Sequence, residues 1–307
     1  MLKRYIAKSA FYKLQRYISA LIAPYVIARQ RLLNRNDARI LMYHSISNFP
    51  PEKDVPYDNV PPALFERQMC RLSEGNFNVV RLSNLIDIIE KGENIPPKTI
   101  VITFDDGYKN NFLNALPVLK KLKLTGTFFL IADRIGKNEP FPHLLWDNPS
   151  REFFSQFPES RLPISWDEAR KLKSHNMEIG SHGLSHQSIG HMELKQAKLE
   201  IFDSKRILEH ELSASVHTFS YPFGSMTYSD YTATTNNLLF DAGYIGACTT
   251  EIGPVINGSN LYELKRIPIR ENDTLPIFEQ KLMGAYDWVN ISKRFFQRTV
   301  TRIDQVY

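Results

Sequence analysis

Two adjacent acids, Asp105 and Asp106, follow a run of β-branched and aromatic residues at positions 100–104. Such a run is typical of a buried parallel strand, so the two carboxylates are expected at its C-terminal end. α/β folds place their active sites at that end. An Asp-Asp-Gly sequence can also be no more than a strand-ending turn, so chemistry is indicated only if other reactive residues accompany the pair.

A histidine pair, His182 and His186, occurs in the stretch EIGSHGLSHQSIGH. On a helix or in a tight turn, a spacing of four puts both imidazoles on one side, although such spacing also arises by chance. Two histidines and one carboxylate would form a catalytic metal site that leaves positions for water and substrate. A second, unbound carboxylate could then act as general base. Together with the aspartate pair, the histidines predict metal-dependent hydrolysis.

Alternating strand-like and helix-like segments must position these side chains. Strands are expected at 39–43, 78–82, 99–104, 126–131, 178–181, 218–221, 244–249 and 264–269. Ser165 and Glu168 form a capping box that opens a helix to about residue 172, and a longer amphipathic helix is expected at 193–212. This alternation predicts an α/β fold with a parallel sheet, and the number of units favours a barrel.

Charge is unevenly distributed along the 307 residues. Residues 1–36 carry eight of the 38 basic residues and no acid, so the rest has 30 basic residues against 33 acidic ones, a net charge of −3. A mildly acidic body argues against nucleic acid as a partner. The two cysteines are too few for a disulfide framework.

The basic N-terminal arm has the pattern of an amphipathic helix. Its apolar residues recur every three or four positions: Phe11, Leu14, Ile18, Leu21 and Tyr25. A basic amphipathic helix can lie in the headgroup region of an anionic membrane, but it can also pack on its own domain or serve as a noncleaved signal-anchor. We expect peripheral membrane contact through residues 1–36, with the cytoplasmic face favoured slightly over the extracytoplasmic one.

Three motifs together resemble one known family. They are TFDDGYKNNFLNALPVLKKLKLTGTFFLI, SWDEARKLKSHNMEIGSHGLSH and TFSYPFGS. In this order and at this spacing they look like the polysaccharide deacetylase family, the NodB-homology or carbohydrate esterase 4 group, over about residues 38–271. The resemblance implies a distorted (β/α) barrel, NodB-like, and metal-dependent removal of acetyl groups from N-acetylated sugars.

The resemblance also assigns roles to residues. It makes Asp105 the general base and Asp106, His182 and His186 the ligands of a divalent metal, which we expect to be zinc. It implies that the backbone N–H of Tyr221, in the Tyr-Pro-Phe-Gly turn, stabilises the oxyanion. Partners implied by the family are N-acetylated glycans, either a polysaccharide or a lipid-linked glycan.

Some positions depart from the family pattern. Gly183 stands where Ser or Thr usually follows the first histidine, and Ser220 stands at the position of the arginine that usually partners the base. Arg266 is a candidate replacement, or an ordinary arginine at the barrel rim. The usual C-terminal Leu-x-His is not visible; instead His44 ends the first strand, which resembles the permuted motif order of poly-N-acetylglucosamine deacetylases. His44 is therefore expected as general acid, unless it is a buried structural histidine.

The expected organisation is an arm at 1–36, a catalytic domain at 37–290 and a tail at 291–307. Trp146, Tyr221 and Phe223 could stack on sugar faces, although aromatic residues more often belong to the core. Two alternatives to N-deacetylation stay open: deacylation of another amide or of an O-acetyl ester, and a non-catalytic carbohydrate-binding domain on the same fold.

Overall fold

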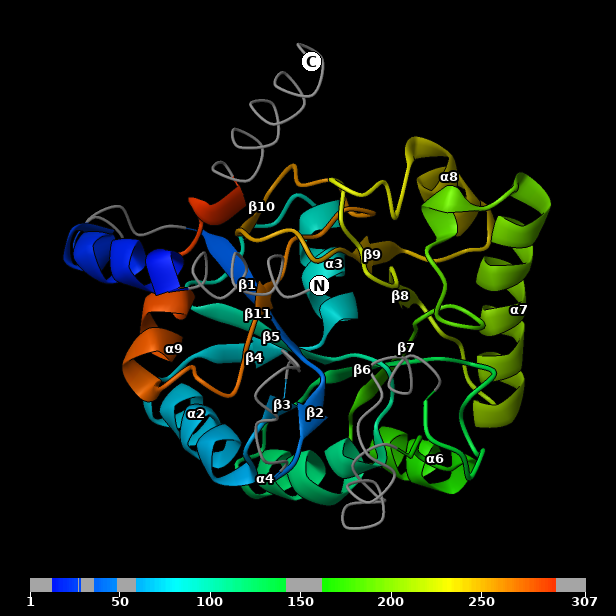
Figure 1. Ribbon diagram of the computed structural model, residues 1–307, viewed down its shortest axis with the longest axis horizontal. Coiled ribbons are helices and arrows are strands. Elements are labelled where there is room, and N and C mark those ends of the chain that lie inside the picture. The colour runs from blue at the N-terminus through cyan, green and yellow to red at the C-terminus, as the bar shows by residue number, and fades with distance from the viewer. Residues whose placement is uncertain (1–12, 27, 29–35, 49–58, 142–161, 291–307) are drawn as a thin grey trace, which may run out of the picture.

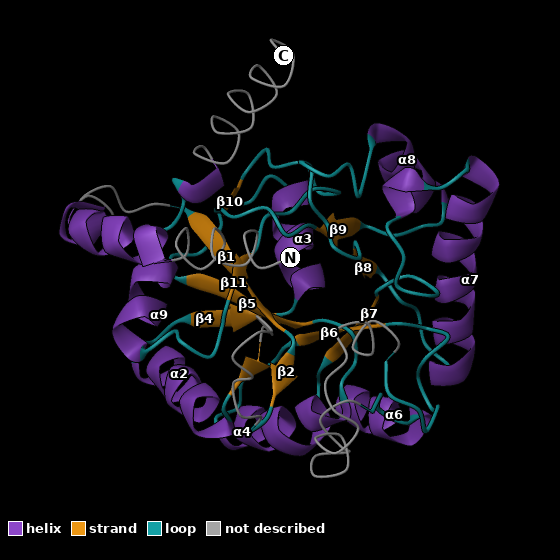
Figure 2. Ribbon diagram, viewed as in Figure 1, coloured by secondary structure: helices purple, strands orange, loops and turns teal. Residues whose placement is uncertain are grey.

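The computed structural model describes residues 13–26, 28, 36–48, 59–141 and 162–290. Within these residues a nine-stranded sheet lies at the centre, and helices surround its outside except α3 (Leu82–Glu90), which lies within its curl (Figures 1 and 2). The sheet consists of β1 (Asp37–Tyr43), β4 (Asn78–Val80), β5 (Thr99–Phe104), β6 (Thr127–Leu130), β7 (Glu178–Ser181), β8 (Thr218–Ser220), β9 (Gly246–Cys248), β10 (Val255–Ile256) and β11 (Ile267–Pro268). Two further short strands, β2 (Ser45–Ile46) and β3 (Asn59–Val60), pair with each other.

The sheet is curled and mostly parallel. Its order is β10-β1-β5-β6-β7-β8-β9, and only β10 pairs with its neighbour in antiparallel fashion. Residues 264–268 lie between the two ends of this order, because Leu264 bridges to Cys248 of β9 and Ile267 pairs with Leu41 of β1. The predicted distorted barrel is confirmed as a curled, mixed half-barrel sheet.

All eight predicted strand positions contain a strand, and two of them, β5 and β7, have the predicted bounds. The short strands β2, β3 and β10 were not predicted. The helices of the domain are α2 (Pro62–Glu74), α3 (Leu82–Glu90), α4 (Leu116–Lys121), α6 (Trp166–Ser174), α7 (Leu194–Leu212), α8 (Ala233–Asp241) and α9 (Leu275–Leu282). Short helical turns occur at Asn111–Ala115 and Ile189–His191. The predicted capping box begins α6: the Ser165 hydroxyl accepts from the Glu168 N–H, and the Glu168 carboxylate accepts from the Ser165 N–H.

β5 faces a core on both sides, which explains its unbroken apolar sequence. Ile100, Ile102 and Phe104 belong to the cluster that packs under the outer helices. Val101 belongs to a second cluster with Phe129 and side chains of α3. Successive side chains of a strand alternate between its faces. The inner row of β5 therefore contains residues 101 and 103, and the next position in that row is Asp105.

The arm contains a helix at residues 13–26, called the arm helix below. It packs on the end of the catalytic domain: Ala23 joins a cluster with Ala285, Tyr286 and Val289, and the Trp288 indole N–H donates to the Ser19 hydroxyl. Within the described ranges, no helix combines the length and the apolar character needed to cross a bilayer. Phe11 of the predicted apolar face, Trp146 and the tail at 291–307 lie outside the described residues.

Candidate active site

Asp105 and Asp106 reach the same site because the backbone turns between them. Asp105 continues the inner row of β5, and its N–H still donates to the Tyr43 carbonyl of β1. Asp106 has φ 71°, in the left-handed region, so it does not continue the strand. Both carboxylates consequently lie beside His182: its Nε2 is 4.0 Å from Asp105 Oδ2 and 3.4 Å from Asp106 Oδ1.

Asp106, His182 and His186 form a compact set of ligand atoms. One donor atom from each lies within 4.8 Å of the others. The Asp106 Oδ1 is 3.4 Å from His182 Nε2 and 3.3 Å from His186 Nε2. Ligand atoms about 2.0–2.1 Å from a tetrahedral metal are about 3.3–3.4 Å from each other. The spacing and the chemistry of these donors therefore fit a divalent cation, and the three residues predicted as ligands are brought together.

His182 is oriented by the neighbouring strand. Its Nδ1 lies 2.7 Å from the backbone carbonyl of Ser220, the last residue of β8. A carbonyl oxygen can only accept, so Nδ1 carries the proton and Nε2 presents its lone pair toward Asp106. This hydrogen bond to a carbonyl is the usual way in which proteins fix the tautomer of a metal-binding histidine.

His186 lies on a loop that a buried carboxylate holds. The loop after β7 is not helical, and His186 has φ 61°. Glu200 of α7 accepts hydrogen bonds from the N–H groups of Leu184 and Ser185, each 2.9 Å long, and from the Ser185 hydroxyl. Gly183 has φ 78°, and a Cβ there would lie 3.3 Å from Glu200 Oε2. The departure from the family's Ser or Thr at position 183 thus has a local cause, because this backbone conformation favours glycine.

Arg266 forms a two-pronged ion pair with Asp105. Its Nη1 and Nη2 each donate to one oxygen of the carboxylate at 2.7 Å, and both side chains are almost completely buried. Its Nε donates to the Thr249 carbonyl and Nη1 also contacts Thr103 Oγ1. The guanidinium is therefore fixed at all of its edges, in the planar geometry that matches a carboxylate. The structure places Arg266 on the carboxylate of Asp105 itself.

The charged groups of the site shift the pKa values of Asp105 and His182. Burial raises the pKa of Asp105, but the positive charge of Arg266, followed by His182 and His44, outweighs burial and lowers that pKa below its ordinary value. Burial lowers the pKa of His182, but Asp105 and Asp106 outweigh it, so the pKa of His182 lies above its ordinary value. Asp105 is thus held as a carboxylate near neutral pH even though water barely reaches it.

The oxyanion role expected for Tyr221 is wrong in this structure. The Tyr221 N–H donates to the Cys248 carbonyl at 3.1 Å, and its buried hydroxyl donates to Asn236. That N–H is therefore already engaged between β8 and the end of β9. Two residues on, the Phe223 N–H makes no hydrogen bond with a described residue, and the Phe223 ring centroid is 5.1 Å from that of His186. The turn that was predicted to supply the oxyanion donor can supply it from Phe223 instead.

A family model agrees with these residues. The model described as "Polysaccharide deacetylase" matches residues 92–247, half of the chain. The chain belongs to the polysaccharide deacetylase family. The match begins before β5 and ends in β9, so it contains both aspartates, both histidines and the Tyr221 turn. His44 and Arg266 lie outside it.

Longer similarities extend over most of the chain. A putative polysaccharide deacetylase of Bacillus subtilis, YxkH, is 26% identical over 80% of this chain and 75% of its own length. A poly-β-1,6-N-acetyl-D-glucosamine N-deacetylase of Staphylococcus aureus is 25% identical over 77% of this chain and 80% of its own. The solved structure of the Streptococcus pyogenes deacetylase PplD shares the fold, with a TM-score of 0.66, 22% identity, and coverage of 80% and 98% of the two chains.

His44 follows β1 directly and lies on the same rim as Asp105. Tyr43 pairs with Phe104 of β5, so His44 and Asp105 follow paired residues of two adjacent parallel strands. His44 therefore lies at the sheet edge that carries Asp105, and its role as general acid stays a prediction.

Sequence reasoning missed the groups that support the site. Glu200 lies on a helical face with Ala197, Ile201 and Ser204, all buried. An acid within the apolar stripe of an otherwise exposed helix was the available signal, because a buried carboxylate needs hydrogen-bond donors. The Ser220 and Thr249 carbonyls gave no signal, since every residue has a carbonyl group.

Proposed function

We propose that this protein is a metal-dependent hydrolase that removes N-acetyl groups from N-acetylated sugars of a polysaccharide or a lipid-linked glycan. The observation that carries the proposal is the pairing of two differently held carboxylates at one site. Asp106 faces two histidines at metal-ligand spacing, while Asp105 is held by Arg266. Family membership supports the reaction class, and the similarity to a Staphylococcus aureus N-deacetylase supports an amide-linked acetyl group.

The donor set determines what the site would hold. Asp106, His182 and His186 would bind a divalent cation, for which we propose zinc, and a bound cation would polarise the amide carbonyl and acidify a water molecule. His182 contributes through Nε2 because its Nδ1 proton is given to the Ser220 carbonyl. Glu200 keeps the loop of His186 in place through three hydrogen bonds.

Asp105 would act as general base. Its lowered pKa keeps it deprotonated, and Arg266 fixes both of its oxygens while Ser220 Oγ lies 3.4 Å from Oδ2. As water attacks the carbonyl carbon of the N-acetyl group, the proton lost by the water passes to the Asp105 carboxylate. The nearby guanidinium keeps this carboxylate oriented throughout.

Two further groups complete the reaction. The Phe223 N–H would donate to the oxygen that becomes negatively charged in the tetrahedral adduct. His44 would give a proton to the sugar nitrogen as the carbon–nitrogen bond breaks, so that the products are acetate and a sugar amine. Arg266 touches no substrate in this scheme and acts by positioning Asp105.

The rim also offers a surface for a sugar. The Phe223 side chain is half exposed beside His186, and Tyr228 of the same loop is largely exposed. Aromatic faces of this kind stack on sugar rings. An O-acetyl ester would meet the same catalytic groups, so the distinction between amide and ester depends on the leaving-group proton from His44, which an amine needs more than an alcohol does.

The proposal is tested by acetate release. The protein would be stripped with a chelator, reloaded with Zn²⁺, and assayed on N-acetylglucosamine oligomers, lipid-linked N-acetylated sugars and an O-acetylated glycan. We expect release from the N-acetylated substrates only after reloading, and release about 10²- to 10⁴-fold slower from the Asp105→Asn variant reloaded in parallel. Glycan binding without acetate release by the metal-loaded protein would instead identify a non-catalytic carbohydrate-binding domain.

A further inference from the structure

The arm helix presents two different faces. One face is buried against the catalytic domain and consists of small and polar side chains, Gln15, Ser19 and Ala23. Their spacing of four residues defines a single stripe along the helix. The contact is specific, since Ser19 accepts from the Trp288 indole and Ala23 packs in the cluster that includes Tyr286. The buried contact of the helix is therefore made by small and polar side chains, with Ile18 and Ile22 partly buried beside them, and four other large apolar side chains take no part in it.

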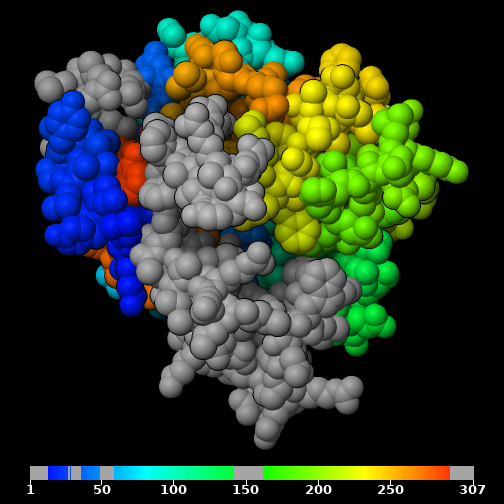
Figure 3. Space-filling view, turned by 45° about the horizontal axis from the view of Figure 1, so that its top comes forward, coloured from blue at the N-terminus to red at the C-terminus, as the bar shows by residue number. Residues whose placement is uncertain are grey.

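Those large side chains point to solvent. Leu14, Tyr17, Leu21 and Tyr25 are 49%, 67%, 64% and 71% exposed. At 100° per residue they fall within an arc of about 70–80° that does not overlap the buried stripe. We call these four residues the arm stripe. In Figure 3 the helix, in blue, lies along the outer edge of the molecule.

The positive charge of the arm indicates what kind of surface the arm stripe contacts. Lys13 and Arg16 lie on the same helix, and residues 1–36 together carry eight cations and no acid. Two copies of this chain that joined through their stripes would bring these like charges together, because a two-fold interface repeats the same surface on both sides. An anionic lipid surface instead attracts the cations and accepts the apolar side chains.

We propose that the arm stripe docks the protein on the surface of an anionic lipid bilayer while the opposite face of the same helix stays attached to the catalytic domain. Leu14 and Leu21 enter the boundary between headgroups and acyl chains, and Tyr17 and Tyr25 lie at the headgroup level, where amphipathic rings accumulate. This inference concerns where the protein works and does not depend on the reaction proposed above.

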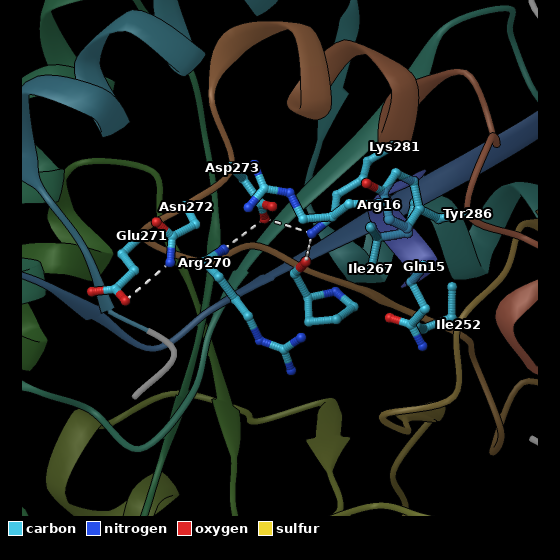
Figure 4. A pocket seen from close by; sticks show the side chains of 11 residues that line it. Gln15, Arg16, Ile252, Ile267, Arg270, Glu271, Asn272, Asp273, Lys281 and Tyr286 are labelled. Atoms are coloured by element: carbon cyan, nitrogen blue, oxygen red, sulfur yellow. Dashed lines mark hydrogen bonds and ion pairs between the residues drawn. The ribbon is translucent and has the colours of Figure 1, made fainter. Parts of the chain in front are cut away.

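The arm helix also borders a cavity of the catalytic domain. Gln15 and Arg16 line a cavity of ≈ 160 Å³ together with Arg270 and Tyr286 (Figure 4). Arg270 follows β11, which runs parallel to β1, so this lining residue lies at the same end of the sheet as His44, which follows β1.

The test is sedimentation of the full chain with lipid vesicles. Wild type, a Leu14→Gln plus Leu21→Gln variant and a Leu194→Gln plus Leu199→Gln variant would be compared on phosphatidylglycerol–phosphatidylcholine vesicles. Leu194 and Leu199 are similarly exposed but lie on α7, on the opposite side of the domain from the arm helix (Figure 1). We expect the arm variant to lose vesicle affinity on the order of 100-fold, given the apolar surface of two leucines, and the α7 variant to match wild type.

Several outcomes would overturn the proposal. Equal vesicle affinity of wild type and the arm variant would show that the arm stripe does not contact the lipid. If the α7 variant lost as much vesicle affinity as the arm variant, the binding would be unspecific adsorption. Wild type should bind anionic vesicles more tightly than pure phosphatidylcholine, with added salt weakening the difference. A dimer in light scattering that the arm variant abolishes would assign the stripe to a second copy. Circular dichroism checks that each variant is folded.

Discussion

Two buried ion pairs of this protein resemble each other in burial but differ in what their oxygens contact. Asp105 pairs with Arg266, and Asp273 pairs with Lys281; all four side chains are nearly inaccessible to water. Asp273 Oδ2 accepts from both the Lys281 ammonium and the Arg270 N–H, and Lys281 also donates to the Pro268 carbonyl. Those bonds tie the end of β11 to α9, which is a structural task.

The ion pair of the candidate active site, Asp105 with Arg266, has a different arrangement. Arg266 approaches Asp105 from one side only, through two parallel hydrogen bonds, while the other side of the carboxylate faces His182 and Asp106. A carboxylate can accept about four hydrogen bonds, so this arrangement leaves Asp105 able to receive a proton from a reacting water. A buried charge therefore does not by itself indicate catalysis. The informative feature is whether the carboxylate lone pairs that its ion-pair partner does not use face other reactive groups.

The largest expected effect is the removal of both histidine ligands. A His182→Ala plus His186→Ala variant should lose bound metal and at least about 10⁴-fold in turnover, because the site then lacks two of its three donors. Metal content by atomic emission and acetate release are the measurements. Full metal occupancy of the folded variant would place the metal elsewhere.

Next in size is the loss of the base. Asp105→Asn should keep the metal and lose about 10²- to 10⁴-fold in turnover, which is the range of general-base catalysis. Asp273→Asn is the matched change at the other ion pair and should leave turnover of the folded protein close to wild type. If Asp105→Asn lost its metal as well, Asp105 would be a ligand and not a base.

Neutralising the cation of each pair separates stability from chemistry. Arg266→Met and Lys281→Met each leave a buried carboxylate without its cation, so each should lower the free energy of unfolding by about 3–5 kcal/mol. Only Arg266→Met should also reduce turnover, by about 10- to 100-fold, because the pKa of Asp105 then rises with burial. Urea unfolding measures the loss of stability and initial rates measure the loss of turnover. Equal losses of turnover in both variants would contradict the conclusion that only the Asp105–Arg266 pair serves catalysis.

The contrast between the pairs was only partly readable in the sequence. The strands that position Asp105 and His182 were predicted because their apolar runs and alternation are local signals. The short strands β2, β3 and β10 were not predicted, since two residues are too few for a pattern. For Arg266 two roles stayed open, partner of the base or ordinary rim arginine, because its contact with Asp105 depends on residues 264–268 joining β9 to β1, which is a property of the whole sheet. The Tyr221 N–H was misassigned because a ladder hydrogen bond depends on register, which a motif does not specify.

A smaller effect is expected at Glu200, which supports the ligand loop. Glu200→Gln keeps the size of the side chain but replaces one acceptor oxygen with a donor, so the N–H groups of Leu184 and Ser185 lose an ideal partner. Metal affinity should fall about 10- to 100-fold, as is typical when a group that orients a ligand is changed, and excess metal should restore turnover. Glu209→Gln, on the same helix but away from the loop, is the control. Unchanged affinity in Glu200→Gln would mean that Gly183 and the turn alone fix His186.

The smallest expected effect is the pH dependence of metal binding. In the metal-free protein the pKa of His182 is raised, since Asp105 and Asp106 outweigh burial, so a proton occupies Nε2 up to a higher pH than in an ordinary histidine. A metal must displace that proton, and its affinity should therefore fall, by up to about tenfold per pH unit, once the pH drops below this raised pKa. Asp105→Asn removes the stronger of the two charges that raise it, so the decline should begin at a lower pH than in wild type. Calorimetric titration of Zn²⁺ across pH measures both curves, and a decline that begins at the same pH in both proteins would show that Asp105 does not control the proton on His182.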